Sequence, residues 1–323
     1  MDERTKGNKD VSSSAHDHDS LGPPKLVEVS EKIFAYLQPD GSWWINNAGF
    51  FVGSKGIISI DSCSTARRTR DYLDTIASVS RQPIRTLVNT HHHGDHTFGN
   101  YLFDTATIIG HERTREDVLH YGLPFDAPIF GPVEWGPVEL APPFVTYKDE
   151  VKMWVDDLPV ELHYVGQPAH TTNDSIVWVP ERELLFAGDL LFNGGTPFLL
   201  MGSVAGAIDV LEKVLKAIPA TTIVPGHGDV CGPELIDEVL EYLRFIMRVA
   251  EDGRRSGITP LEAARGTDLG RFADLLDPER IVGNLHRAYA ELGGAAKGAR
   301  IDTKAALMDM VDYNGGKPLS CYA

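Results

Sequence analysis

Residues 91–96 read His-His-His-Gly-Asp-His and follow an apolar, strand-like segment at 84–90. Imidazole and carboxylate groups together suit a divalent cation such as zinc. In an extended segment alternate side chains share a face, so we expect His91, His93 and Asp95 to project together and His92 to point away. Gly94 permits a turn from which His96 can reach a second cation. A surface histidine cluster is the alternative, and the rest of the chain argues against it.

Three further candidate ligands stand where strand-like segments give way to loops. His170, Asp189 and His227 follow the strand patterns at 160–165, 184–187 and 222–224, respectively. A sheet fixes the position of such a residue while the loop exposes its side chain. A lone His after a strand is usually structural, but the four segments in this order predict a metal centre.

This pattern resembles the metallo-β-lactamase fold superfamily, whose hallmark is His-x-His-x-Asp-His followed by separate His, Asp and His residues. The resemblance implies an α/β fold, an αββα sandwich with a helical C-terminal extension. It also implies two divalent cations, with zinc expected and iron or manganese as alternatives. The implied ligands are His91, His93 and His170 for the first cation, Asp95, His96 and His227 for the second, and Asp189 as a bridge between them.

The presence of Asp189 also narrows the resemblance within this superfamily. The best-known lactamases lack a bridging Asp at this point, so the full set is more similar to the glyoxalase II, lactonase and thioesterase branches. In these branches Asp95 and Asp189 would act together with a metal-bound hydroxide. Asp61, at the end of the strand-like segment 56–61, is expected to steady a ligating His from behind.

Composition predicts a globular protein with three parts. The chain has 323 residues and is 42% hydrophobic, enough for a substantial core. We expect a polar, disordered leader at 1–24, a catalytic domain at 25–232 and a helical extension at 233–323 packed on the same domain. Neither a signal peptide nor an apolar run of membrane-spanning length is evident, and three cysteines are too few for a disulfide scaffold. These features predict a cytoplasmic protein without a membrane partner.

The net charge of −16 argues against a nucleic-acid partner, because binding a phosphate backbone requires clustered Lys and Arg. Two similar halves of strand and helix patterns suggest two sheets packed face to face. Helices are expected at 65–78, 111–120, 204–218, 233–251, 260–265 and 278–292. The apolar stripe on 233–251 suits either core packing or a homo-oligomer interface. The Pro-rich, aromatic segment 121–148 is either a lid or a wrap over the sheet edge.

A narrower resemblance lies outside the ligands, in segments 135–140, 196–198, 202–206, 259–292 and 313–316. These are similar to the metallo-β-lactamase-fold cyclases that close the second ring in actinorhodin-type polyketide assembly. The resemblance implies an aldol-type condensation with loss of water, with or without thioester hydrolysis. The substrate would be a polyketide intermediate, either free or tethered to acyl carrier protein. Trp43, Trp44, Phe192 and Phe198 are candidates for the walls of its pocket.

Two other functions remain open from the sequence. The same site could hydrolyse a thioester or lactone, as in glyoxalase II and the lactonases. Some members of this fold hold iron and handle oxygen, and a site of carboxylates and histidines can accept iron.

Overall fold

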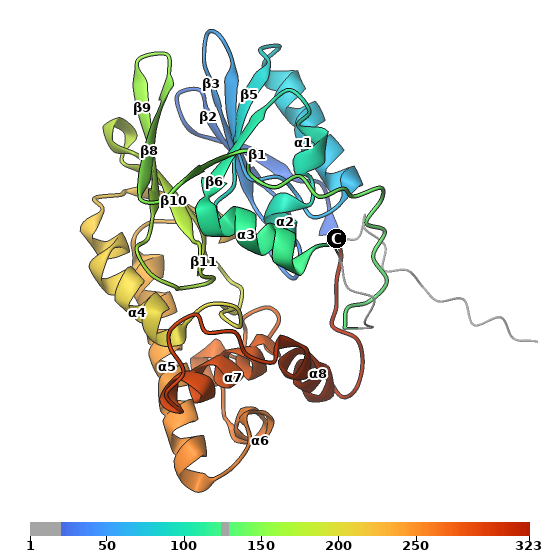
Figure 1. The fold of residues 1–323 in the computed structure, drawn as a ribbon, viewed down its shortest axis with the longest axis vertical. Coiled ribbons are helices and arrows are strands. Elements are labelled where there is room, and N and C mark those ends of the chain that lie inside the picture. Colours follow the sequence, from blue (N-terminus) through green and yellow to red (C-terminus); the bar gives the residue numbers. More distant parts are fainter. Residues whose placement is uncertain (1–20, 124–128) are drawn as a thin grey trace, which may run out of the picture.

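The computed structural model describes residues 21–123 and 129–323, in which two β-sheets pack face to face between layers of helices (Figure 1). Strands β1–β7 form the first sheet in chain order. Their bounds are β1 (Lys25–Ser30), β2 (Ile33–Leu37), β3 (Ala48–Val52), β4 (Ile57–Ile60), β5 (Ile84–Val88), β6 (Thr107–His111) and β7 (Val145–Tyr147). Strands β1 to β4 pair antiparallel, and β4 to β7 pair parallel. The parallel pairing brings the carboxyl ends of β4 and β5, which lead to Asp61 and His91, to the same edge.

The second sheet has the order β12-β11-β10-β9-β8. Its strands are β8 (Glu150–Val155), β9 (Leu158–Tyr164), β10 (Ser175–Val179), β11 (Leu184–Phe192) and β12 (Thr222–His227). Only β11 and β12 pair parallel. Asp189 on β11 and His227 at the end of β12 therefore lie on adjacent strands.

The layers are held by separate apolar clusters. Between the sheets, Phe51 and Val88 of the first pack with Leu162 and Phe186 of the second. On the outer face of the first sheet, helix α1 (Ala66–Val79) packs through Tyr72. Short helix α2 (Gly94–Thr97) and helix α3 (Glu112–Tyr121) follow β5 and β6. Helix α4 (Val204–Lys213) lies on the second sheet, so the expected αββα sandwich is confirmed (Figure 1).

The chain after His227 is helical, as expected. Its helices are α5 (Glu234–Ser256), α6 (Pro260–Gly266), α7 (Arg280–Leu292) and α8 (Thr303–Tyr313). One buried apolar cluster runs from β11 through α4 into α5, α7 and α8, and it includes Leu191, Leu243, Leu285 and Met310. The apolar stripe of α5 is buried in this cluster. Core packing therefore accounts for the stripe, one of the two roles that the sequence left open.

Several boundaries differ from the expected ones. The apolar pattern at 43–52 is a strand only from Ala48 onward, and Trp44 before it adopts a positive φ of 67°. The helix expected over 204–218 ends at Lys213. Strand β11 continues to Phe192, so Asp189 lies within the strand rather than after it. Strand β7 and helix α8 were not anticipated. Residues 1–20 of the expected leader and 124–128 of the Pro-rich segment lie outside the described residues.

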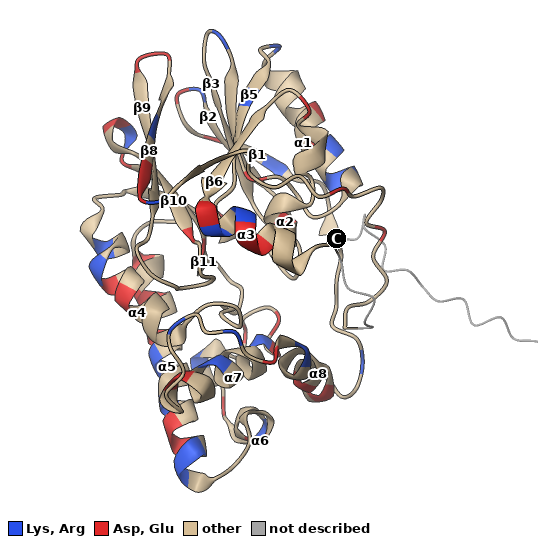
Figure 2. Ribbon diagram, viewed as in Figure 1, with Lys and Arg blue, Asp and Glu red and all other residues tan. Residues whose placement is uncertain are grey.

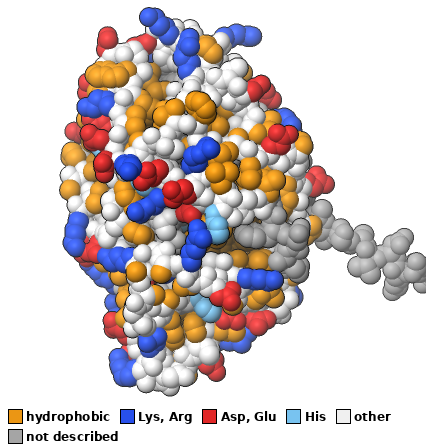
Figure 3. Space-filling view, viewed as in Figure 1, with side chains coloured by type: hydrophobic (Ala, Val, Ile, Leu, Met, Phe, Trp, Pro, Cys, Tyr) orange, Lys and Arg blue, Asp and Glu red, His pale blue; other side chains and the backbone are white. Residues whose placement is uncertain are grey.

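Charged residues of both signs are interspersed along α3, α4 and α5 (Figure 2). The face shown in Figure 3 likewise mixes Lys and Arg with Asp and Glu, between hydrophobic groups. Within the described part of the chain, no helix has the length and apolar character needed to cross a membrane.

Candidate metal centre

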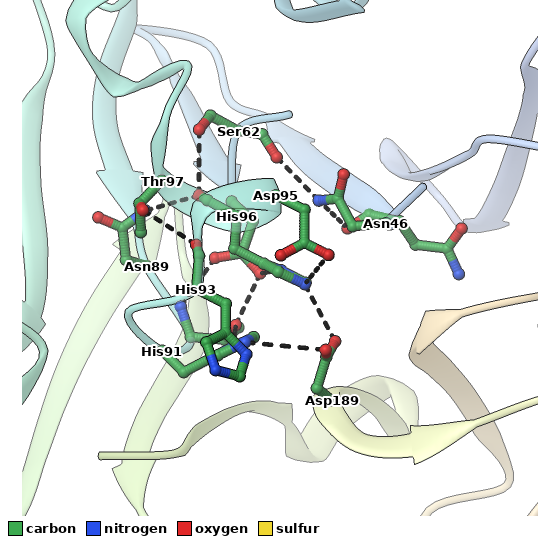
Figure 4. Close-up of polar contacts among 12 residues, drawn as sticks. Asn46, Ser62, Asn89, His91, His93, Asp95, His96, Thr97 and Asp189 are labelled. Carbon is green, nitrogen blue, oxygen red and sulfur yellow. Dashed lines mark hydrogen bonds and ion pairs between the residues drawn. The ribbon is translucent and has the colours of Figure 1, made fainter. Parts of the chain in front are cut away.

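The structure brings all seven expected ligands together in two adjoining groups. His91, His93, His170 and Asp189 form the first group, and Asp95, His96, His227 and Asp189 form the second. Within each group the candidate ligand atoms all lie within 4.8 Å of one another. Asp189 belongs to both groups, which is the position that a bridging carboxylate requires (Figure 4).

The Asp189 carboxylate is the centre of the cluster. Its Oδ1 lies 3.0 Å from His96 Nε2. Its Oδ2 lies 3.3 Å from both His170 Nε2 and His227 Nε2, and 3.8 Å from His91 Nε2. Rings from both groups therefore face one carboxylate from different sides.

The outer nitrogens of three imidazoles are held by acceptors. His170 Nδ1 donates to Phe198 O at 2.5 Å, and His227 Nδ1 donates to Gly41 O at 3.1 Å. His96 Nδ1 lies 2.8 Å from Asp61 Oδ2. A proton held on Nδ1 leaves the Nε2 lone pair directed into the cluster, as a metal ligand requires. Asp61 thus lies behind a ligand candidate, where the sequence placed it.

A glycine permits the close approach of β12 to Asp189. A Cβ added at Gly226 would lie 1.9 Å from Asp189 Oδ1. No side chain larger than hydrogen fits this space without moving the carboxylate. The Gly-His-Gly segment therefore both presents His227 and leaves room for the shared ligand.

One expectation about the histidine motif is wrong. His91, His93 and Asp95 do not share the face of an extended segment, because helix α2 begins at Gly94 with His93 as its N-cap. The turn sends Asp95 into the second group with His96 and leaves His91 and His93 in the first. His92 lies outside both groups, as expected.

The two groups differ in their electrostatics. Burial lowers the pKa of His91 and of His93 well below the ordinary value, and neighbouring imidazoles lower it further. Burial acts on His96 and His227 in the same direction, but nearby carboxylates outweigh it. Asp189 and Asp61 raise the pKa of His96 well above its ordinary value, and Asp189 and Asp95 raise that of His227 to about 9. The second group is therefore the more strongly ion-paired of the two.

The imidazole nitrogens of the first group that lack a hydrogen-bond partner show whether these residues fit a cation. Among the described residues, the Nε2 atoms of His91 and His93 are buried and lack a hydrogen-bond partner. His93 Nδ1 lies 2.8 Å from His170 Nε2, and two imidazole nitrogens can face each other in this way only around a shared proton or a cation. Nitrogen and carboxylate ligands in sets of four suit zinc and similar divalent metals. The two clusters are therefore suited to metal ions.

An aromatic pocket opens on the cluster; the empty space in it and in its solvent-open mouth together is about 880 Å³. Asp95, Asp189, His93, His170 and His227 line one part of it. The four expected wall residues, Trp43, Trp44, Phe192 and Phe198, all line the pocket. Phe192 stacks on His227 with ring centroids 4.8 Å apart, so the aromatic wall directly adjoins the candidate ligands.

Several pocket residues were missed by sequence reasoning. They are Phe98, Met201, Arg280 and Leu307, whereas Tyr121 and Phe130 come from segment 121–148, for which a lid was one of the two expectations. Arg280, at the start of α7, is buried; its Cζ lies 4.1 Å from the centroid of the Trp43 ring and its Nη2 lies 2.7 Å from Asp277 Oδ2. No local pattern signals this role, because an Arg early in an amphipathic helix is usually solvated. Helices α7 and α8, which follow the last candidate ligand in the chain, thus complete the pocket.

Comparison with known proteins agrees with this architecture. The model of the metallo-beta-lactamase superfamily matches residues 41–227. A metallo-beta-lactamase type 2 of Bacteroides fragilis is 24% identical over 68% of this chain and 84% of its own length. The 2,4-dinitroanisole O-demethylase subunit alpha of Nocardioides sp. (strain JS1661) is 27% identical over 69% of this chain and 62% of its own length.

Two more comparisons concern a hydrolase of the superfamily and a solved structure with this fold. A hydroxyacylglutathione hydrolase of Rhodospirillum rubrum is 33% identical, over 44% of this chain and 46% of its own length. The structure of a metallo-beta-lactamase from Pontibacter korlensis superposes with a TM-score of 0.58 at 18% identity and covers 69% of this chain and 99% of that one. The chain therefore belongs to the metallo-β-lactamase superfamily, and its two His/Asp clusters are suited to metal ions.

Proposed function

We propose that this protein closes the second ring of an aromatic polyketide intermediate by intramolecular aldol-type condensation and dehydration. The observation that carries the proposal is the aromatic pocket that opens on both ligand groups. Its walls of Trp, Phe and Tyr suit a flat, partly aromatic acyl chain. The demethylase relative also has, by its name, an aromatic substrate.

Three of the five segments that resemble polyketide cyclases contribute residues to this pocket or to the packing of its wall. Phe198, from segment 196–198, forms part of its wall, and Arg280, from segment 259–292, lies against Trp43. Trp135, from segment 135–140, packs against Trp44 with ring centroids 4.8 Å apart. These three residues would therefore help to determine the shape of the pocket that holds the substrate.

In the proposed reaction, a methylene between two carbonyls loses a proton, and its carbon forms a bond to a second carbonyl carbon of the same chain. Loss of one water from the resulting alcohol then leaves the aromatic ring. When bound, two divalent cations, zinc in the first instance, would supply Lewis acidity toward the carbonyl oxygens. The chain's own residues hold the ligands, exclude water with aromatic walls and confine the acyl chain to one conformation. Asp95, which lines the pocket, offers a carboxylate oxygen that can receive the methylene proton.

Hydrolysis of a thioester or lactone is the second candidate. It is favoured by the local similarity to a hydroxyacylglutathione hydrolase, together with the carboxylate of Asp189 shared by both groups. In this case water adds to the acyl carbon, and a thiol or alcohol leaves. One enzyme could also perform both reactions, closing the ring and then releasing the product.

The experiment is mass analysis of the product from a first-ring polyketide intermediate, offered on acyl carrier protein and as a small-molecule thioester. Cyclisation removes one water from the acyl chain, and we expect this loss with metal-loaded enzyme and its absence after chelation. Release of the uncyclised acid would contradict the cyclase and support the hydrolase. Turnover of only the carrier-bound form would identify the carrier protein as a partner, whereas turnover of the small thioester alone would exclude it.

A further inference from the structure

His92 lies between two candidate ligands but belongs to neither group. Its ring is buried, stacks on Tyr121 with centroids 5.1 Å apart and lines the aromatic pocket. Its Nδ1 lies 3.1 Å from Asn173 Nδ2. Nothing in the proposed chemistry yet uses this side chain.

The partners of Asn173 determine which way its amide points. Asn173 Nδ2 lies 2.9 Å from a carboxylate oxygen of Asp117, and a carboxylate can only accept a hydrogen bond. Asn173 Oδ1 accepts from Thr114 Oγ1 at 3.1 Å. The amide nitrogen, a donor, therefore faces His92. Nδ1 of His92 must accept this hydrogen bond and so carries no proton.

An imidazole whose Nδ1 is an acceptor carries its proton on Nε2. Within residues 21–123 and 129–323, His92 Nε2 is buried and has no hydrogen-bond partner. Buried donors are nearly always paired, because an unpaired one loses its interaction with water without compensation. The pocket that His92 lines is where a partner for this N–H can come from.

We propose that His92 Nε2–H donates a hydrogen bond to a carbonyl oxygen of the substrate bound in the aromatic pocket. This inference rests on the proposed function, which places a keto or thioester group there. Stacking on Tyr121 holds the ring, and Asn173 determines which nitrogen donates. His92 would thereby hold the reacting carbonyl beside His93 and His170, which line the same pocket.

The test uses the metal-loaded full chain, ¹⁵N-histidine NMR and benzoylacetone, an aromatic 1,3-diketone, as the probe. We expect the spectrum of His92 to show the Nε2–H form, and the Nε2 resonance to shift when the probe binds. His92→Phe keeps the ring on Tyr121 and removes the donor, so the probe should bind roughly tenfold more weakly. His92→Gln places an amide N–H near the original Nε2 and should restore much of the affinity. His120→Phe, on the exposed side of α3, is the matched control and should bind normally.

Melting temperature and metal content of each variant separate a binding role from a structural one. An Nδ1–H form of His92 would overturn the inference, whatever the enzyme's reaction is. Equal affinity in wild type and His92→Phe would overturn it as well. If the wild type bound no diketone, the polyketide proposal would fail, and the KM for a thioester or lactone would then decide on His92. If His92→Phe left the KM for that thioester or lactone unchanged, the proposed hydrogen bond from His92 would be refuted for the hydrolase as well.

Discussion

Nδ1 of His96 lies 2.8 Å from Oδ2 of Asp61, on the side of the ring opposite to Asp189. Asp61 also accepts hydrogen bonds from the backbone N–H and the hydroxyl of Thr90, at 2.8 and 2.7 Å. The carboxylate is therefore held in place by the strand end that leads to the histidine motif. Its contact sets the orientation of His96 and adds to the basicity of the ring.

Replacing Asp61 with Asn should weaken metal binding by roughly 10–100-fold, because the charged acceptor behind His96 is lost. Competition with a chromophoric chelator measures this affinity. Asp74→Asn, on the exposed face of α1, should bind metal as the wild type does. Wild-type affinity in the Asp61 variant would show that the acceptor on His96 Nδ1 does not need to be charged.

Asp189→Ala should lose metal from both groups, because Asp189 is the one residue they share. His93→Ala should affect the first group alone, because His93 belongs only to that group. Elemental analysis of the purified variants gives the metal-to-protein ratio, and activity should fall with it. Full metal content and full turnover in either variant would refute the ligand assignment.

Gly226→Ala should lower both metal content and stability, since the new Cβ would lie 1.9 Å from Asp189 Oδ1. Overpacking of this kind destabilises a protein by about 1–3 kcal/mol. Gly266→Ala is the matched control, because its Cβ would meet no atom within 4 Å. Urea unfolding and elemental analysis check both effects. A Gly226 variant as stable and as metal-rich as the control would contradict the predicted clash.

Arg280→Met should destabilise the protein by about 3–5 kcal/mol, because it leaves the Asp277 side chain, which is only 9% exposed, without its ion-pair partner. Asp277→Asn combined with Arg280→Met removes both charges and should recover part of this loss. Chemical unfolding of the two single variants and the double variant gives the coupling energy. Additive losses would show that the two charges do not interact.

The buried carboxyl of Asp174 should make the free energy of unfolding depend on pH. Burial raises the pKa of its carboxyl to about 7, although the carboxyl accepts hydrogen bonds from the N–H and hydroxyl of Thr171. Between about pH 4 and 7 the folded state thus binds a proton that the unfolded state has released. The stabilisation is complete below this window and is lost as the pH rises through 7.

Asp174→Asn lacks this titration, so it provides the comparison. From pH 5.5 to 8, the free energy of unfolding of wild type should fall relative to that of the variant by more than about 1 kcal/mol. Urea unfolding at the two pH values measures the difference. Parallel curves for the two proteins would mean that Asp174 is ionised throughout.

Much of the fold could be predicted because its signals are local. The strand patterns that end near Asp61 and His91 became the neighbouring parallel strands β4 and β5, and those that carry Asp189 and His227 became the parallel pair β11 and β12 of the second sheet. Helix α8 was missed because no strong periodic pattern or proline marked its start, in contrast to α6. The short helix α2 was missed because strand alternation was extended past Gly94, where the chain turns.

The sequence alone determined the order of the strands and helices and the identity of the seven candidate ligands, because apolar periodicity and ligand-bearing loops are encoded within a few residues. Tertiary structure decided how these parts meet. It oriented Asn173 toward His92 and brought Arg280 against Trp43 across more than two hundred residues of chain. Such contacts depend on how sheets and helices pack, and no local pattern specifies which distant side chains share a pocket.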